Sequence, residues 1–124
     1  MALNRALRLR KSSEFQRVRQ QGRSITSRLL ILAWIPNEVA KLRVGFVVSK
    51  RISKLAVERN RVKRLLGEAI RRHLTELPGG WDIVLSARNG VTTADLHAFE
   101  EDIVSLLHRA RLLEPEPEQK TYNT

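Results

Sequence analysis

The chain of 124 residues is long enough for one domain with a modest core, since 42% of its residues are hydrophobic. The absence of cysteine excludes a disulfide framework, a thiolate metal site and a cysteine nucleophile. No apolar run approaches the roughly 18 residues of a membrane span. The start, MALNRALRLRK, does not resemble a secretory signal, and we expect a cytoplasmic protein with no membrane partner.

The charge is large and uneven. The chain holds 23 Lys and Arg against 13 Asp and Glu, a formal net charge of +10. Residues 1–76 contain 19 of the cations and 5 of the acids and carry +14, whereas residues 77–124 carry −4. A basic surface on one part of a small fold indicates a polyanionic partner, and a merely solvated basic surface is the alternative.

The first predicted elements are a helix and a strand. SSEFQRVRQQG predicts a short helix with Ser12 or Ser13 as N-cap and Gly22 at its end. ITSRLLILAWIP is strand-like and stops at Pro36, and Pro36–Glu38 predict a tight turn. Two or three strands are therefore expected before the central helix.

A second strand follows in KLRVGFVVSKR, antiparallel to the first because of the tight turn between them. One face of this strand carries Leu42, Val44, Phe46 and Val48. The other face carries Arg43, Gly45, Val47 and Ser49.

The second half predicts a helix, a strand and a helix. The helix around Arg59 runs until Pro78–Gly80, and WDIVLSAR predicts a strand buried on both faces. Thr92, with Asp95 three residues on, predicts the N-cap of a last helix. Residues 114–124, EPEPEQKTYNT, predict a disordered tail, which leaves 1–113 as the domain, with a basic arm at 1–11. The fold class is α+β or mixed α/β, with helices packed on one sheet.

The helix around Arg59 places its cations on two sides. With about 100° per residue and Val62 at zero, its apolar positions centre near 25° and face the sheet. One outward set lies on the opposite side: Asn60, Arg61, Arg64, Glu68 and Arg71. Arg59 and Lys63 instead lie over the apolar side, near the helix N-terminus.

Unpaired cations over a core are costly, so Arg59 and Lys63 require either an open groove or a carboxylate, for which Glu58 is the main candidate. We expect a groove between the start of this helix and the sheet, with these two cations on its floor. The helix N-terminus adds partial positive charge and free N–H groups, which suit a phosphate. A solvated cationic helix without a dedicated ligand is the alternative.

The segment from Val48 to Arg64 also resembles a known family. VSKR followed by AVERNRVKR is similar to the signature of the bacterial ribonuclease P protein subunit, in which a strand end and a short loop precede Arg-Asn-Arg-x-Lys-Arg on a helix. The resemblance continues upstream into RLRKSSEFQRVRQQGRS and downstream into WDIVLSARNGV, and covers about residues 5–112.

The resemblance implies an α-β-β-β-α-β-α sandwich with a left-handed βαβ crossover. It implies a protein cofactor of a catalytic RNA that cleaves the 5′ leader from precursor tRNA, with Mg²⁺ bound mainly by the RNA and no obligate protein partner. The implied RNA-contacting residues, with Arg71 added from the outward face, are Arg59, Asn60, Arg61, Lys63, Arg64, Ser49, Lys50, Arg51 and Arg71. The residues assigned to the cleft for the leader are Phe15, Arg10, Lys11, Arg19 and Arg28. Phe15 would offer its ring to a leader base.

Three positions depart from the family pattern. Arg19 stands where many members have a second aromatic residue on the opening helix, and Ala33 stands at the strand aromatic, with Trp34 on the other face. Gly67 replaces a frequent Arg, which removes a cation from the outer face of the helix. We therefore expect weaker base stacking and more phosphate contact.

The residues indicate no protein active site and no metal site. His73 lies within the apolar stripe of its helix, and His97 and His108 are about 16 Å apart along theirs, too far to share a metal. Residues 100–102 predict a solvated acidic face that balances Arg109 and Arg111. Two other functions stay open at this point: a structural, ribosomal-type RNA-binding protein of similar fold, and a nuclease in its own right.

Overall fold

The computed structural model describes residues 7–112, and its elements follow the predicted order. They are α1 (Ser12–Gln21), β1 (Arg23–Thr26), β2 (Leu30–Pro36), β3 (Arg43–Val47), α2 (Ala56–Arg71), β4 (Trp81–Ala87) and α3 (Leu96–Arg109), with two short 3₁₀ turns, η2 (Leu74–Glu76) and η3 (Val91–Thr93). The predicted tail at 114–124 and most of the basic arm lie outside the described residues.

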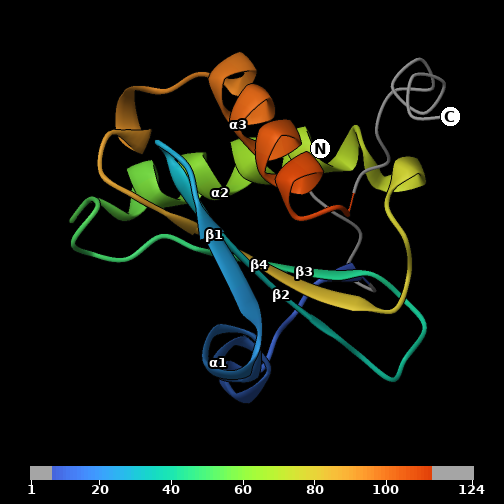
Figure 1. Cartoon of the computed structure of the whole chain (residues 1–124). Helices are drawn as coiled ribbons and strands as arrows, with labels where there is room; N and C mark the ends of the chain where they lie inside the picture. Colours follow the sequence, from blue (N-terminus) through green and yellow to red (C-terminus); the bar gives the residue numbers. More distant parts are fainter. Residues whose placement is uncertain (1–6, 113–124) are drawn as a thin grey trace, which may run out of the picture.

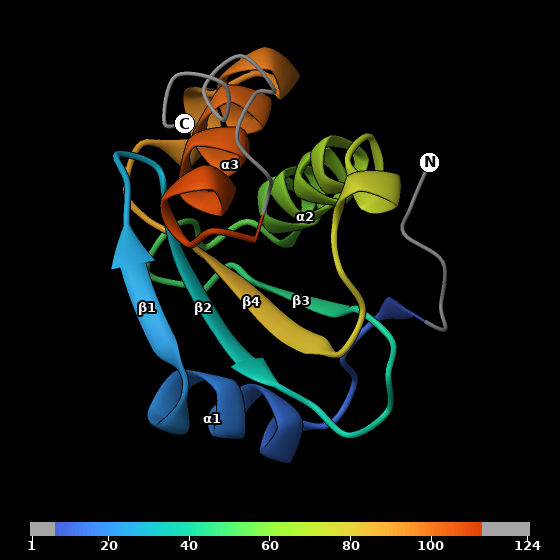
Figure 2. The ribbon, with the colours of Figure 1, turned by 45° about the vertical axis from the view of Figure 1, so that its right-hand side comes forward.

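The four strands form one mixed sheet in the order β1-β2-β4-β3 (Figure 2). β4 pairs antiparallel with β2 and parallel with β3, so β3, α2 and β4 form the predicted βαβ unit. β2 and β3 run in opposite directions, as expected, but they are not neighbours in the sheet, because β4 lies between them. β4 is apolar on both faces, and a central position buries both.

The strand-like segment at 25–36 is part of a hairpin, so three strands precede α2 rather than two. β1 pairs antiparallel with β2, with Arg23 opposite Trp34 and Thr26 opposite Ile31. Ser27 makes the reversal, because its backbone N–H donates to the Leu30 carbonyl at 2.8 Å and its hydroxyl accepts from the Leu30 N–H at 3.2 Å. A serine hydroxyl that bonds nearby backbone is a local turn signal, and the long apolar run hides it.

Three predicted helix ends are also wrong. α1 has Lys11 as N-cap rather than Ser12 or Ser13. α3 has Asp95 rather than Thr92, and the Asp95 carboxylate accepts from the Ala98 N–H at 2.9 Å. α2 ends at Arg71, and η2 intervenes before the turn at Pro78–Gly80.

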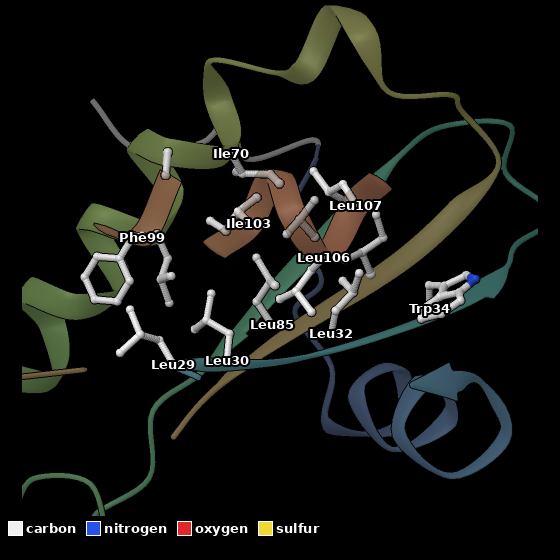
Figure 3. Packing of buried hydrophobic residues seen from close by; sticks show 14 of the residues in the cluster. Leu29, Leu30, Leu32, Trp34, Ile70, Leu85, Phe99, Ile103, Leu106 and Leu107 are labelled. Carbon is white, nitrogen blue, oxygen red and sulfur yellow. The ribbon is translucent and has the colours of Figure 1, made fainter. Parts of the chain in front are cut away.

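The sheet separates two apolar clusters. α2 and α3 cover one face and α1 the other (Figure 1). The larger cluster lies under α2 and α3 and includes Phe99, Ile103 and Leu85 (Figure 3). The predicted inner face of β3 is confirmed, since Leu42, Val44 and Val48 are buried in this cluster and Phe46 packs against it. The smaller cluster, under α1, has four buried residues: Leu9, Val18, Ala33 and Val84.

Candidate RNA interface

A cleft of about 480 Å³ lies at the edge strand β3, between the arm before α1 and the side of α2. The arm runs beside β3, because the Leu9 N–H donates to the Val44 carbonyl at 3.0 Å. Four cations line the cleft: Arg8, Arg10, Lys63 and Arg64. Among the described residues that line it, none is acidic, so the cleft offers a positive potential to an anion.

Phe15 supplies aromatic surface to the cleft, beside Phe46 of β3. The Phe15 ring lies against Gly45 of β3, where an added Cβ would come within 2.3 Å of a ring carbon. Glycine at this position therefore lets the ring rest on the strand backbone. Phe15 is only half-buried, so part of the ring remains available to a ligand.

One stripe of α2 forms the opposite wall. Asn60, Lys63, Arg64 and Gly67 all line the cleft. They follow the i, i+3, i+4, i+7 spacing of a single helix face. A groove between this helix and the sheet is present as predicted, but of the two cations expected on its floor only Lys63 lines it. Asn60 and Arg64 line it instead of facing away from the sheet. Because β3 is the edge strand, this flank of the helix stands beside the sheet edge, where the arm pairs with β3 only at Val44 among the described residues.

Gly67 also differs from expectation. It is buried at the base of the wall rather than on the outer face of the helix. A side chain there would occupy the cleft, so glycine widens it.

Two arginines of the predicted RNA-contacting set bind the protein itself. Arg59 does not line the cleft, and its guanidinium donates to the Ser53 carbonyl at 3.0 Å. The Arg61 guanidinium reaches the carbonyls of Thr92 and Ala94 at 3.5 and 3.4 Å. Arg59 thus supports the loop before α2, and Arg61 holds α2 against the segment before α3. Long side chains take whatever acceptor the fold presents, which helical periodicity does not encode.

The loop between β3 and α2 presents Lys50 and Arg51 to solvent. Its turn is held by the Ser49 carbonyl, which accepts from the N–H groups of Ile52 and Ser53 at 3.0 and 3.4 Å. The Ser53 hydroxyl in turn donates to Glu58, so Glu58 serves the loop rather than the two cations it was expected to meet.

The remaining predicted residues lie outside the cleft lining. Arg71 is exposed and pairs with Glu68 at 2.6 Å, and this hydrogen bond lowers the pKa of Glu68. Lys11 and Arg19 are exposed at the cap and last turn of α1. Arg28 lies in the β1–β2 turn and lines a different hollow, beside Asn89 and Thr93 of the loop after β4. Of the five residues expected at a leader cleft, Phe15 and Arg10 line this cleft, and Arg8 lines it as well.

The groups expected to have no catalytic role have structural partners. His73 Nε2 lies 3.2 Å from Glu100, at the boundary between α2 and α3. Asp102 accepts from the Leu29 N–H at 3.1 Å. The expectation that residues 100–102 form only a solvated face is therefore wrong.

Between residues 7 and 112 no cluster of three or more His, Asp or Glu is placed to hold a metal. In the same part of the chain no helix is long and apolar enough to cross a membrane.

Ala33, which stands where many family members have a strand aromatic, and its neighbour Trp34 lie on the two expected faces of the sheet. Ala33 is buried under α1 in the same cluster that Phe15 packs against, and Trp34 faces the other side, in the larger core. The aromatic residues that line the cleft are Phe15 of α1 and Phe46 of β3.

Comparison with known proteins decides the family. Residues 3–111 match the family model for ribonuclease P. The chain belongs to the ribonuclease P protein family. It is 44% identical over 120 residues to the ribonuclease P protein component of Chloroflexus aurantiacus, which covers 96% of this chain and 87% of that protein. It is 40% identical over 107 residues to the one from Caldanaerobacter subterraneus, covering 86% and 91%.

Solved structures agree. The RNase P protein of Staphylococcus aureus matches with a TM-score of 0.80 and 27% identity, over 89% of this chain and all of that one. The RNase P protein of Thermotoga maritima matches with a TM-score of 0.74 and 28% identity, over 82% and 96%. The chain is therefore a subunit of the ribonucleoprotein endoribonuclease of tRNA processing, and its partner is the RNA of ribonuclease P. The ribosomal-type alternative is not favoured.

Proposed function

We propose that this ribonuclease P protein binds two RNAs through two separate surfaces. The cleft beside β3 takes the single-stranded 5′ leader of precursor tRNA. The loop at 49–55 binds the catalytic RNA. The observation that carries the proposal is the cleft itself, in which two phenylalanine rings and four cations line a hollow at a strand edge.

The cleft has the chemistry of a single-strand site. A half-buried ring such as Phe15 stacks on a base of any sequence, and cations track the phosphates. Lys63 and Arg64 on one wall face Arg8 and Arg10 on the other, so a strand lying between them has cations on both sides. With four cations in the lining, phosphate contact supplies a large share of the affinity, which makes binding steeply salt-dependent.

The loop suits a structured RNA. Lys50 and Arg51 stand on a turn held by backbone hydrogen bonds, so their charges are presented without ordering a flexible segment. The RNA carries the catalysis and binds Mg²⁺, while the basic protein surface neutralises the phosphates that converge around it.

The experiment measures cleavage and binding with purified components. Protein alone with Mg²⁺ should leave precursor tRNA intact, and protein with its RNA should stimulate cleavage at low Mg²⁺. Cleavage without RNA would overturn the proposal in favour of a protein nuclease.

Variants separate the two surfaces. Phe15→Ala and Arg64→Ala should weaken binding of leader-bearing precursor and leave mature tRNA little changed. Lys50→Ala should weaken binding of the catalytic RNA and reduce the salt slope by about one. Arg23→Ala, which removes the same charge from the opposite edge of the sheet, is the matched control. Equal losses for all RNAs in every variant would contradict the two-surface proposal.

A further inference from the structure

Behind the wall of the cleft, a chain of charged side chains joins α1 to the sheet. Glu14 accepts from the Arg43 guanidinium at 3.0 Å. The other side of the same guanidinium makes two bonds to Asp82, at 2.9 and 2.8 Å. Asp82 is 1% exposed and is the buried charged residue of the described chain. A bidentate pair of this kind defines orientation as well as distance.

Two more side chains contact the Asp82 carboxylate. The Asn37 side-chain amide donates to it at 2.8 Å, and the Arg17 guanidinium lies 3.6 Å away. Arg17 also donates to the Pro36 carbonyl at 2.9 Å. Because Glu14 and Arg17 are three residues apart, one face of α1 is attached to this network at two points.

Glu14 also holds the arm. Its Oε1 accepts from the backbone N–H groups of both Arg10 and Lys11, each at 3.0 Å. These two bonds, and then the nearby Arg43 guanidinium, lower the pKa of Glu14. One carboxylate thus connects the arm, the first turn of α1 and the edge strand.

The contacts of Glu14 and of Phe15 are adjacent. Arg43 and Gly45 are two residues apart on β3 and face the same side of the sheet. Glu14 binds the first and the Phe15 ring lies on the second. The position of the ring, and of Arg10 in the arm, therefore depends on where the network holds the start of α1.

We propose that Glu14, Arg43 and Asp82 are positioning residues for the leader cleft. They set the separation between the wall formed by the arm and Phe15 and the cations of α2, and they bind no RNA themselves. This inference rests on the proposed function of the cleft. The small apolar cluster under α1 gives little directional restraint, so directional polar bonds are needed to define this wall.

The test uses the protein reconstituted with its RNA and two substrates, precursor tRNA with a leader and the same tRNA without one. Glu14→Ala should reduce affinity for the leader-bearing substrate by about tenfold, because the carboxylate and its bonds to the arm are lost. Glu14→Gln should lose less affinity than Glu14→Ala, because its amide oxygen can still accept from both N–H groups although its NH2 group cannot accept from Arg43. Affinity for leaderless tRNA and for the catalytic RNA should not change.

Two further measurements and a control variant distinguish positioning from simple structural support. KM for the leader-bearing substrate should rise in Glu14→Ala while kcat stays the same. The amides of Arg10 and Lys11 should exchange faster with solvent. Glu101→Gln, at an exposed acid of α3 paired with His97, is the matched control and should change neither.

The proposal is overturned if Glu14→Ala binds the leader-bearing substrate within about twofold of wild type, or loses both substrates equally. If the wild-type protein itself binds both substrates equally well, the proposed function of the cleft is wrong. That outcome differs from a failure of the positioning role alone, in which the wild type prefers the leader and Glu14→Ala keeps that preference. Where Glu14→Ala does not fold, Arg43→Lys is used, since it keeps the charge but loses the bidentate geometry. Unchanged leader affinity in Arg43→Lys would likewise reject the proposal.

Discussion

The two faces of the sheet are built by different means. The face under α2 and α3 buries 20 residues in one apolar cluster, whereas the face under α1 buries four. The face under α1 instead has charged hydrogen bonds, which run from Glu14 through Arg43 to Asp82. Apolar packing supplies stability without fixing a binding surface, and polar bonds fix a surface with little net stability. The comparison suggests that stability and RNA recognition can be disturbed separately.

The largest change in stability is expected on the face of the sheet under α2 and α3. Phe99→Ala removes a fully buried ring from the larger core and should lower the free energy of unfolding by about 3–5 kcal/mol. The measurement is urea denaturation followed by circular dichroism. Where the variant remains folded, its preference for leader-bearing substrate should persist, and loss of that preference would break the proposed separation.

A smaller change in stability with a larger change in binding is expected at Gly45. Gly45→Ala forces the new methyl group into the Phe15 ring, which must move, and the overpacking should cost about 1–3 kcal/mol. Leader affinity should fall more than stability alone explains. Unaltered leader binding in this variant would show that the ring position does not matter.

Acid should lower the stability contributed by the face under α1, by less than the two substitutions above. The pKa of Glu14 lies below its ordinary value of 4.5, because the N–H groups of Lys11 and Arg10 and the Arg43 guanidinium stabilise the carboxylate. A lowered folded-state pKa contributes stability above pH 4.5, and this is lost as the pH falls through the folded-state pKa.

The measurement is the difference in urea midpoint between wild type and Glu14→Gln, from neutral pH down to pH 3. The difference should be present at neutral pH and shrink below pH 4.5. Arg71 also lowers the pKa of Glu68, so Glu68 contributes to the acid dependence in the same direction as Glu14. Comparing wild type with Glu14→Gln isolates the contribution of Glu14. A difference that does not vary with pH would contradict this assignment.

The smallest effect concerns the end of α3. Arg111 follows the helix with φ of 62°, a left-handed conformation that side chains disfavour. Arg111→Gly should therefore raise the free energy of unfolding by up to about 1 kcal/mol. Thermal denaturation checks the sign, and RNA binding should stay the same, since this residue is not among those lining the cleft. A lower melting temperature would mean that Arg111 makes contacts worth more than the strain.

Much of the fold follows from local patterns. Alternation in Leu42–Val48 predicted which face of β3 packs inward, and the order of helices and strands followed from apolar spacing. The stripe at Asn60, Lys63, Arg64 and Gly67 was also present in the sequence, since these residues share one helix face. It was missed because a helical wheel shows angles but not which side of the helix stands beside the sheet edge.

The sequence by itself determined the family, through the run from Val48 to Arg64, and with it the RNA-binding role. Only the tertiary structure decided that β4 separates β2 from β3, because strand pairing depends on burying both faces of the most apolar strand. It also decided which cations are available. The guanidinium groups of Arg59 and Arg61 bind carbonyls of Ser53, Thr92 and Ala94, whereas Arg64 lines the cleft. Acceptors distant in sequence determine where long side chains point, and local periodicity carries no information about them.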